Sequence, residues 1–418
     1  MAFASGWLQK GSLFGPVIEE APGKNTGIIA VVPSLNEPHL TTLLNSLNEC
    51  MPPVCGVEVI IVVNAPPDAP EEVKAGNRKD LVNIRRWKNK NNPFFRLYAV
   101  HIEDPPVKGW GVGLARKTGM DEALRRFSHI SRPEGVIACL DGDCTVSASY
   151  FRSLEDELLK RKDRRACAVY FEHPVSGTEY TQEIYSAITQ YELHLRYYLM
   201  ALKYSGFPDA FHTIGSTIAV KAETYMKAGG MNRRQAGEDF YFVQKLVPLG
   251  GFFSLNSATV SPSPRRSWRV PFGTGNAIGK MTDRGETVFR TYNPGAFTDL
   301  KAFFATCSSG ISEYGEDYRK IHASFPQSVR DFLPPEELKD KMDEISRNTS
   351  GTPAFRKRFF GWFNMFRVVK YLNHAHISHY SKVAAEEAAC EILERMGIEY
   401  CETDAKTLLM KLRMIERG

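Results

Sequence analysis

The chain has 418 residues, of which 43% are hydrophobic and 24% charged, and its formal net charge is +5. These values suit a globular protein of one large domain or two ordinary ones, and so small a charge gives no ground for nucleic-acid binding. No apolar stretch is long enough to span a bilayer. Residues 1–24 lack the pattern of a signal peptide. The eight cysteines show no zinc spacing, so we expect reduced thiols in a cytoplasmic protein.

Strand and helix patterns alternate over the first 170 residues. Short apolar runs bounded by turn residues predict strands at 27–32, 57–63, 95–102, 135–140 and 166–171. Helical spacing follows Pro38 and recurs at 111–127 and 150–161, whereas 71–87 suits a polar helix or a loop. This alternation predicts the α/β class, with a mostly parallel sheet flanked by helices.

The second half of the chain changes character. A long helix is expected from Glu179 to about Lys203, a strand from Ile214 to Val220, and helices from Ala222 and after Gly237. Past about residue 290 only helical patterns remain, near 355–372, 380–396 and 404–416. We therefore expect three parts, which are an N-terminal arm at 1–26, a catalytic domain at 27–290 and a helical region at 291–418.

Two carboxylates, Asp141 and Asp143, follow the fourth expected strand. Open α/β sheets bind ligands at the carboxyl ends of their strands. In a turn beyond the strand, both side chains can converge on Mg²⁺ or Mn²⁺, which prefer oxygen ligands and share the oxygens of a diphosphate. Taken alone, Asp-x-Asp is also typical of a surface turn with two solvated acids, so the interpretation depends on the other motifs.

A glycine-rich segment precedes the helix expected at 111–127. Gly109, Gly111 and Gly113 would let the backbone approach a ligand at a helix N-terminus, which favours anions. Arg116 lies one turn further, where its guanidinium can fork onto phosphate oxygens. The alternative is an ordinary junction between a loop and a helix.

Four motifs stand in a fixed order: residues 33–37 after the first strand, the glycine segment 109–119, the acidic pair, and residues 229–231 leading to Glu238 and Asp239. In this order the chain resembles glycosyltransferase family 2, of the GT-A nucleotide-sugar fold, over roughly residues 27 to 260. The resemblance implies a hexosyltransferase-like enzyme. It would transfer one sugar from a nucleotide-diphosphate sugar to a hydroxyl acceptor, usually with inversion, and use Mn²⁺ or Mg²⁺.

The resemblance also assigns roles on the donor side. Asp143 is expected to bind the metal, and Asp141 to contact the ribose or the metal shell. Asn36 and Glu37 are expected to line the nucleoside pocket with Pro33, near Gly113 and Arg116. A helix N-cap with an acid in the first turn explains Asn36 and Glu37 equally well.

On the acceptor side, Asp239 is the candidate general base, which would take the proton of the attacking hydroxyl. Glu238 would hold Asp239 or contact the acceptor. Because Gly-Glu-Asp also favours a helix start, with acids complementing the helix dipole, a purely structural role stays open.

Two departures from the family pattern matter. Asn64 stands nearest the position where the family's second strand usually ends in an aspartate, so the preference for a uracil base is open. Residues 265–269, Arg-Arg-Ser-Trp-Arg, replace the Gln-x-x-Arg-Trp signature of processive members, so we expect one transfer per encounter. This cluster could clamp a diphosphate, stack on a sugar, or form a basic surface loop.

Two further features are open. His212 could be a third metal ligand, an acceptor contact, or a partly buried structural histidine. The aromatic and basic segment 355–372 could dock against the catalytic domain or lie on an anionic membrane surface, which would place a cytoplasmic protein at the inner membrane.

Rival functions remain, which are a retaining transferase of the same fold, a nucleotidyltransferase, and a catalytically silent binding protein. The acceptor, whether sugar, lipid or small molecule, and the oligomeric state are open as well.

Overall fold

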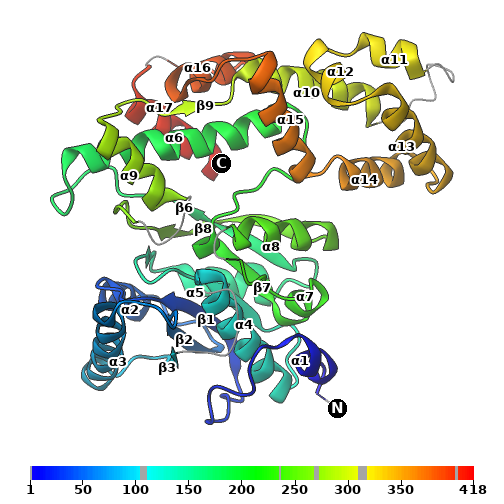
Figure 1. Cartoon of the computed structure of the whole chain (residues 1–418). Helices are drawn as coiled ribbons and strands as arrows, with labels where there is room; N and C mark the ends of the chain where they lie inside the picture. Colours follow the sequence, from blue (N-terminus) through cyan, green and yellow to red (C-terminus); the bar gives the residue numbers. More distant parts are fainter. Residues whose placement is uncertain (1, 104–110, 235–236, 268–272, 309–317, 401–402) are drawn as a thin grey trace. The chain divides into compact units, whose positions relative to one another are not determined.

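A computed structural model describes residues 2–103, 111–234, 237–267, 273–308, 318–400 and 403–418 (Figure 1). The chain forms two compact units, Met1–Gly177 with Thr213–Gly279, and Thr178–His212 with Lys280–Gly418. The helix expected at 179–203 therefore belongs with the C-terminal helices. The three expected parts, at 1–26, 27–290 and 291–418, stay a prediction.

The first unit is built on an eight-stranded sheet, whose order is β3-β2-β1-β4-β7-β6-β8-β5. The strands are β1 (Thr26–Ser34), β2 (Gly56–Ala65), β3 (Arg96–Glu103), β4 (Val136–Cys139), β5 (Thr145–Val146), β6 (Ala166–Phe171), β7 (Ile218–Lys221) and β8 (Phe252–Ser261). The strands β3, β2, β1 and β4 are parallel to one another, and β6 is parallel to β8. β7 is antiparallel to both β4 and β6, and β5 is antiparallel to β8. The predicted α/β class with a mostly parallel sheet is confirmed.

All nine residues of β1 are buried because helices cover both faces of the sheet. Ile28, Ala30 and Val32 point into one apolar cluster, together with the leucines of α2 (Leu40–Asn48). Ile29 and Val31 point into the other, which contains apolar side chains of α4 (Val112–His129). The alternation follows from the two-residue period of a strand.

The remaining helices of this unit include one that the sequence left undecided. The segment at 71–87 is a helix, α3 (Glu71–Asn91). The others are α1 (Ser5–Gly11), α5 (Tyr150–Leu154) with a π-helical turn at Glu155–Leu159, α7 (Ala222–Lys227) and α8 (Glu238–Leu246). The strand expected from Ile214 begins later than predicted, since Gly215–Thr217 form a 3-10 turn before β7.

The second unit is mainly helical. Its helices are α6 (Gln182–Tyr204), α10 (Pro294–Cys307), α11 (Tyr318–Ser324), α12 (Gln327–Phe332), α13 (Pro335–Arg347), α14 (Thr352–Trp362), α15 (Met365–Ser378), α16 (Ala385–Arg395) and α17 (Ala405–Arg417). α9 (Thr274–Arg284) crosses the boundary between the units, and β9 (Arg290–Thr291) pairs with β10 (Val383–Ala384). In the parts of the chain that the structure covers, no helix is long and apolar enough to cross a membrane.

The aromatic segment expected at 355–372 is two helices, because the Asn364 side chain caps α15 and separates it from α14. Phe359 and Phe363 are buried, and their rings pack against Phe303 and Phe304 of α10. These aromatic side chains therefore pack inside the helical unit. The sequence analysis instead expected the segment to dock on the catalytic domain or to lie on a membrane.

Gly119 permits close packing of α4 on β1, and this generates a stability prediction. A Cβ at Gly119 would lie 2.4 Å from Cγ1 of Val31. We expect Gly119→Ala to lower the free energy of unfolding by about 1–2 kcal/mol, because overpacking outweighs the gain in helix propensity. Urea unfolding measures this.

Gly6 in α1 is the matched control, since a Cβ there meets nothing within 4 Å. Gly6→Ala should be neutral or stabilise by up to about 1 kcal/mol. Equal stability of Gly119→Ala and the wild type would contradict the packing argument.

Candidate functional site

The site lies at the point in the sheet where the order of the strands reverses, between β1 and β4. β1 lies between β2 and β4, so the loops that follow β1 and β4 flank one crevice at the carboxyl ends of the strands. A Cβ on Gly142 would lie 2.8 Å from Cγ of Glu37. The glycine between Asp141 and Asp143 thus lets Glu37 approach them.

Arg265, which follows β8, connects the two loops. Its Nε donates to Oδ2 of Asp143 at 2.7 Å, and its Nη2 donates to the buried Glu37 carboxylate. Burial raises the pKa of Asp143, and the charges of Asp141 and Glu37 add to this, whereas Arg265 opposes it. The side chain of Asp143 is 21% exposed.

The sequence offered Arg265 only as part of a basic cluster, with three roles left open. Its ion pairs with Asp143 and Glu37 connect residues far apart in sequence. Of the same cluster, Trp268 and Arg269 lie outside the described residues, as do Gly109 and Trp110 of the glycine segment.

A second arginine, Arg116 on α4, lies on the other side of the acidic pair. Its Nη2 donates to Oδ1 of Asp141 at 2.5 Å, and its Nη1 donates to Glu238. The side chain is only 2% exposed, and Gly215 makes room for it, since a Cβ there would lie 2.6 Å from Nη1. Burial alone would lower the pKa of Arg116, but Asp141 and Glu238 raise it well above its ordinary value, so Arg116 stays charged.

Glu238 and Asp239 begin α8, directly after Gly237, whose φ of 71° is left-handed. Oδ1 of Asp239 accepts the N–H of Phe240 at 2.7 Å. Burial raises the pKa of Asp239 to about 6, the neighbouring Glu238 adds to the shift, and Arg116 opposes it. A carboxyl group with this pKa can accept and release a proton near neutral pH, as a general base must.

Gly113, which the sequence assigned to the donor site, has a packing role in the structure. A Cβ on Gly113 would lie 2.3 Å from the backbone oxygen of Arg234. The first turn of α4 therefore packs closely against the segment that precedes α8. This contact brings the helix that carries Arg116 near the helix that carries Asp239.

The candidate nucleoside residues are joined by two side chains of α3. Asn77 accepts the N–H of Asn36 at 2.7 Å and donates to the backbone oxygen of Asn64 at 3.0 Å. Asp80 accepts the N–H of Glu37 at 2.8 Å. Sequence reasoning missed Asn77 and Asp80. Their one signal is that two short polar residues recur one helical turn apart in a helix whose other polar positions are mostly charged.

Two of the predicted site residues lie apart from these contacts. Pro33 is buried within β1, in register with Val62 of β2. His212 belongs to the helical unit, where its Nε2 is 2.5 Å from Oε1 of Glu416. Burial would raise the pKa of Glu416, but His212 and Arg196 lower it to about 2. A role for His212 as third metal ligand stays a prediction.

The acidic pair has the oxygen donors that Mn²⁺ and Mg²⁺ prefer. Among the described residues, no three or more His, Cys, Asp or Glu side chains are placed to hold a metal ion. The donor set thus fits a cation that takes one or two carboxylates and fills its other positions with water and phosphate oxygens.

No protein-family model and no curated protein sequence matches the chain. Solved structures do match it. TarS from S. aureus in complex with UDP-GlcNAc is 13% identical over 90% of this chain and 93% of that one, with a TM-score of 0.40. Mannosyltransferase PcManGT from Pyrobaculum calidifontis, with GDP-Man and Mn²⁺, is 14% identical over 99% and 92%, with a TM-score of 0.38. Glucosyl-3-phosphoglycerate synthase from Mycobacterium tuberculosis, with Mn²⁺, UDP and glucosyl-3-phosphoglycerate, is 12% identical over 68% and 80%, with a TM-score of 0.35.

Proposed function

We propose that the chain is a metal-dependent GT-A glycosyltransferase that moves one sugar from a nucleotide-diphosphate sugar to a hydroxyl acceptor. One observation carries this proposal. The buried guanidinium of Arg116 binds both Asp141, in the acidic pair, and Glu238, which adjoins Asp239. A sugar transferase needs a group that anchors the donor and a base that activates the acceptor, held at a fixed separation. Arg116 supplies that connection.

On the donor side, Asp143 and Asp141 would hold Mn²⁺ or Mg²⁺, which when bound neutralises charge on the departing diphosphate. Arg265 holds Asp143 and Glu37 in place. Its guanidinium is also of the kind that binds phosphate oxygens in pairs. The nucleoside would lie over Asn36 and Asn64, whose backbone Asn77 fixes.

On the acceptor side, Asp239 would take the hydroxyl proton while the acceptor oxygen bonds to the anomeric carbon and the bond to the diphosphate breaks. Glu238 is paired with Arg116, so we assign it the role of positioning the start of α8, and the role of base to Asp239. A single base and a single displacement give inversion. NMR of the product anomer tests this, and retention would overturn the assignment of Asp239 as base.

The acidic pair generates the first activity prediction. We expect Asp143→Asn to reduce metal-dependent transfer by roughly a hundredfold or more, because it removes a charged ligand of the metal. Asp141→Asn should weaken donor binding more than it slows transfer. Donor turnover over a panel of nucleotide sugars with Mn²⁺, and calorimetry of nucleotide binding, measure the two effects.

Asp163, a highly exposed acid of the same unit, is the matched control, and Asp163→Asn should behave as the wild type. Full activity of Asp143→Asn would contradict the metal assignment. Absence of donor binding by the wild type across the whole panel would contradict the proposed function.

The raised pKa of Asp239, about 6, generates a prediction of pH dependence. Because the base must be deprotonated, kcat/KM should rise with pH up to about 6 and level off above it. Asp239→Asn should lose roughly a hundredfold to ten-thousandfold of the rate.

The variant Glu238→Gln tests the part that Glu238 plays in the shift. Burial is the main cause of the raised pKa of Asp239, and the variant removes the negative charge that adds to it, so the rise in kcat/KM should move to lower pH. A pH profile identical to that of the wild type, or an active Asp239→Asn variant, would show that another group limits the reaction.

A further inference from the structure

The outer face of α3 and the start of β3 carry an uneven distribution of charge. From Leu81 to Ile102 the sequence contains no aspartate or glutamate. Over the same stretch it has five lysines and arginines, and all of them are exposed: Arg85, Arg86, Lys88, Lys90 and Arg96. Five exposed cations with no acid in the same stretch of sequence give this part of the surface a positive potential that the modest net charge of the chain hides.

Exposed apolar side chains accompany this basic face. Among the described residues, seven large apolar side chains are strongly exposed, and four of them lie on or beside α3 and the starts of β2 and β3. These are Met51 at 52%, Val54 at 73%, Val82 at 45% and Phe94 at 39% exposed. Because Glu58 pairs with Arg96, the segment before β2 and the segment before β3 lie at the same edge of the sheet.

The position of Phe94 is fixed. Its ring packs edge-on against Phe95 and Phe151, at centroid distances of 5.3 and 6.0 Å, while part of it stays exposed. Apolar side chains that gather beside basic ones on a surface typically mark a site of interaction.

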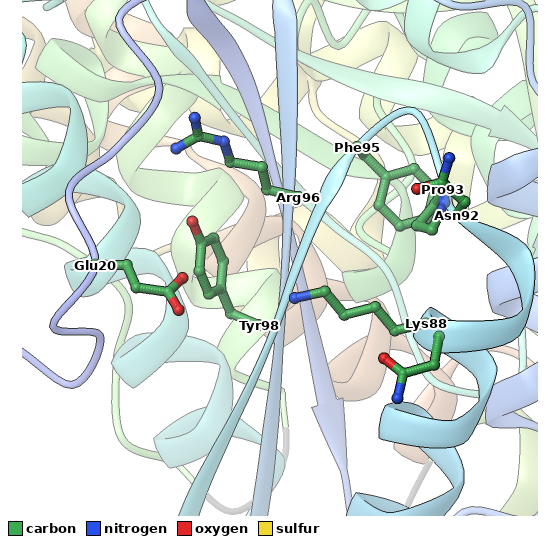
Figure 2. A pocket seen from close by; sticks show the side chains of 8 residues that line it. Glu20, Lys88, Asn92, Pro93, Phe95, Arg96 and Tyr98 are labelled. Carbon is green, nitrogen blue, oxygen red and sulfur yellow. The ribbon is translucent and has the colours of Figure 1, made fainter.

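A pocket of about 530 Å³ opens on the same face, between the last turn of α3 and β3 (Figure 2). Lys88, Arg96 and Tyr98 line it, and Glu20 from the N-terminal segment is the acid among its lining residues. Nζ of Lys88 donates to the backbone oxygen of Leu97 at 3.1 Å and lies 6.0 Å from the centre of the Tyr98 ring. Two cations, Lys88 and Arg96, on the lining of one pocket suit a phosphate group.

We propose that this face of α3 and β3 docks the protein on an anionic lipid surface. The basic side chains bind headgroup phosphates, and Phe94 and Val54 enter the interface between headgroups and acyl chains. Three of the four exposed apolar side chains are aliphatic, which suits acyl chains better than the stacking that single-stranded nucleic acids use. The proposal does not depend on the proposed sugar transfer.

The experiment measures co-sedimentation of the full chain with vesicles of phosphatidylcholine alone or mixed with phosphatidylglycerol. We expect binding to the mixed vesicles only, weakened by added salt. The triple variant Arg85→Glu, Arg86→Glu and Lys90→Glu should bind at least roughly a hundredfold more weakly, since each basic residue near an anionic surface contributes several-fold.

The matched control carries the same change of charge on the other segment considered for membrane contact. Lys357→Glu, Arg358→Glu and Lys370→Glu change exposed residues of α14 and α15 and should leave vesicle binding unchanged. Thermal unfolding of both triple variants checks that they fold. Val54→Ser with Phe94→Ser keeps the charges and should leave a weaker binding that salt abolishes.

Several outcomes would overturn the proposal. They are the absence of binding to mixed vesicles by the wild type, equal binding by the α3 triple variant, and loss of binding in the α14 and α15 variant alone. Preferential binding of single-stranded RNA over mixed vesicles in a competition would assign the face to nucleic acid instead.

Discussion

The buried guanidinium of Arg116 is the constraint on which the candidate site depends. An unpaired charge at such depth costs several kcal/mol, and removing one partner of a buried pair typically costs about 3–5 kcal/mol. Arg116 is therefore compatible with the fold only because Asp141 and Glu238 both bind it. Each arrives from a different element, so the loop after β4 and the start of α8 must keep their positions. The same ion pairs require glycine at positions 113 and 215. A Cβ on Gly113 would meet the backbone of Arg234, and a Cβ on Gly215 would meet the guanidinium of Arg116 itself.

The charge balance around Arg116 favours a cation. The described residues of the site include five acidic side chains (Glu37, Asp141, Asp143, Glu238 and Asp239) and two arginines, Arg116 and Arg265. With all five ionised, the formal excess is three negative charges, and burial makes that excess costly. Burial, together with the neighbouring carboxylates, raises the pKa of both Asp143 and Asp239, as such an excess of negative charge requires. A divalent cation would offset this excess and, under the proposed function, the charge of a diphosphate donor.

The sequence predicts what depends on neighbouring residues and misses what depends on distant ones. Four of the five early strands are predictable because their apolar runs are buried on both faces, and the edge strand β3 keeps Leu97 and Val100 buried. β8 alternates irregularly between buried and exposed positions and gives no such signal. The acidic pair, Arg116 and Asp239 stand out as motifs. The partners of Arg265 do not, since they lie 122 and 228 residues away along the chain. Asn77 is similar, because only the packing of α3 on β2 shows that it orders the loop after β1.

The two proposals place constraints on the acceptor when they are combined. Asp141 and Asp143 lie at the carboxyl ends of the parallel strands, whereas Val54 and Phe94 precede β2 and β3 at the amino ends. β1 has nine residues, and at about 3.3 Å per residue the two edges are roughly 30 Å apart. A protein whose Val54 and Phe94 enter the lipid at the amino edge would therefore hold the candidate catalytic crevice away from that bilayer. A hydroxyl at the membrane surface would then be out of reach of Asp239. The combination favours an acceptor that is dissolved, or one that extends at least this far from its lipid anchor.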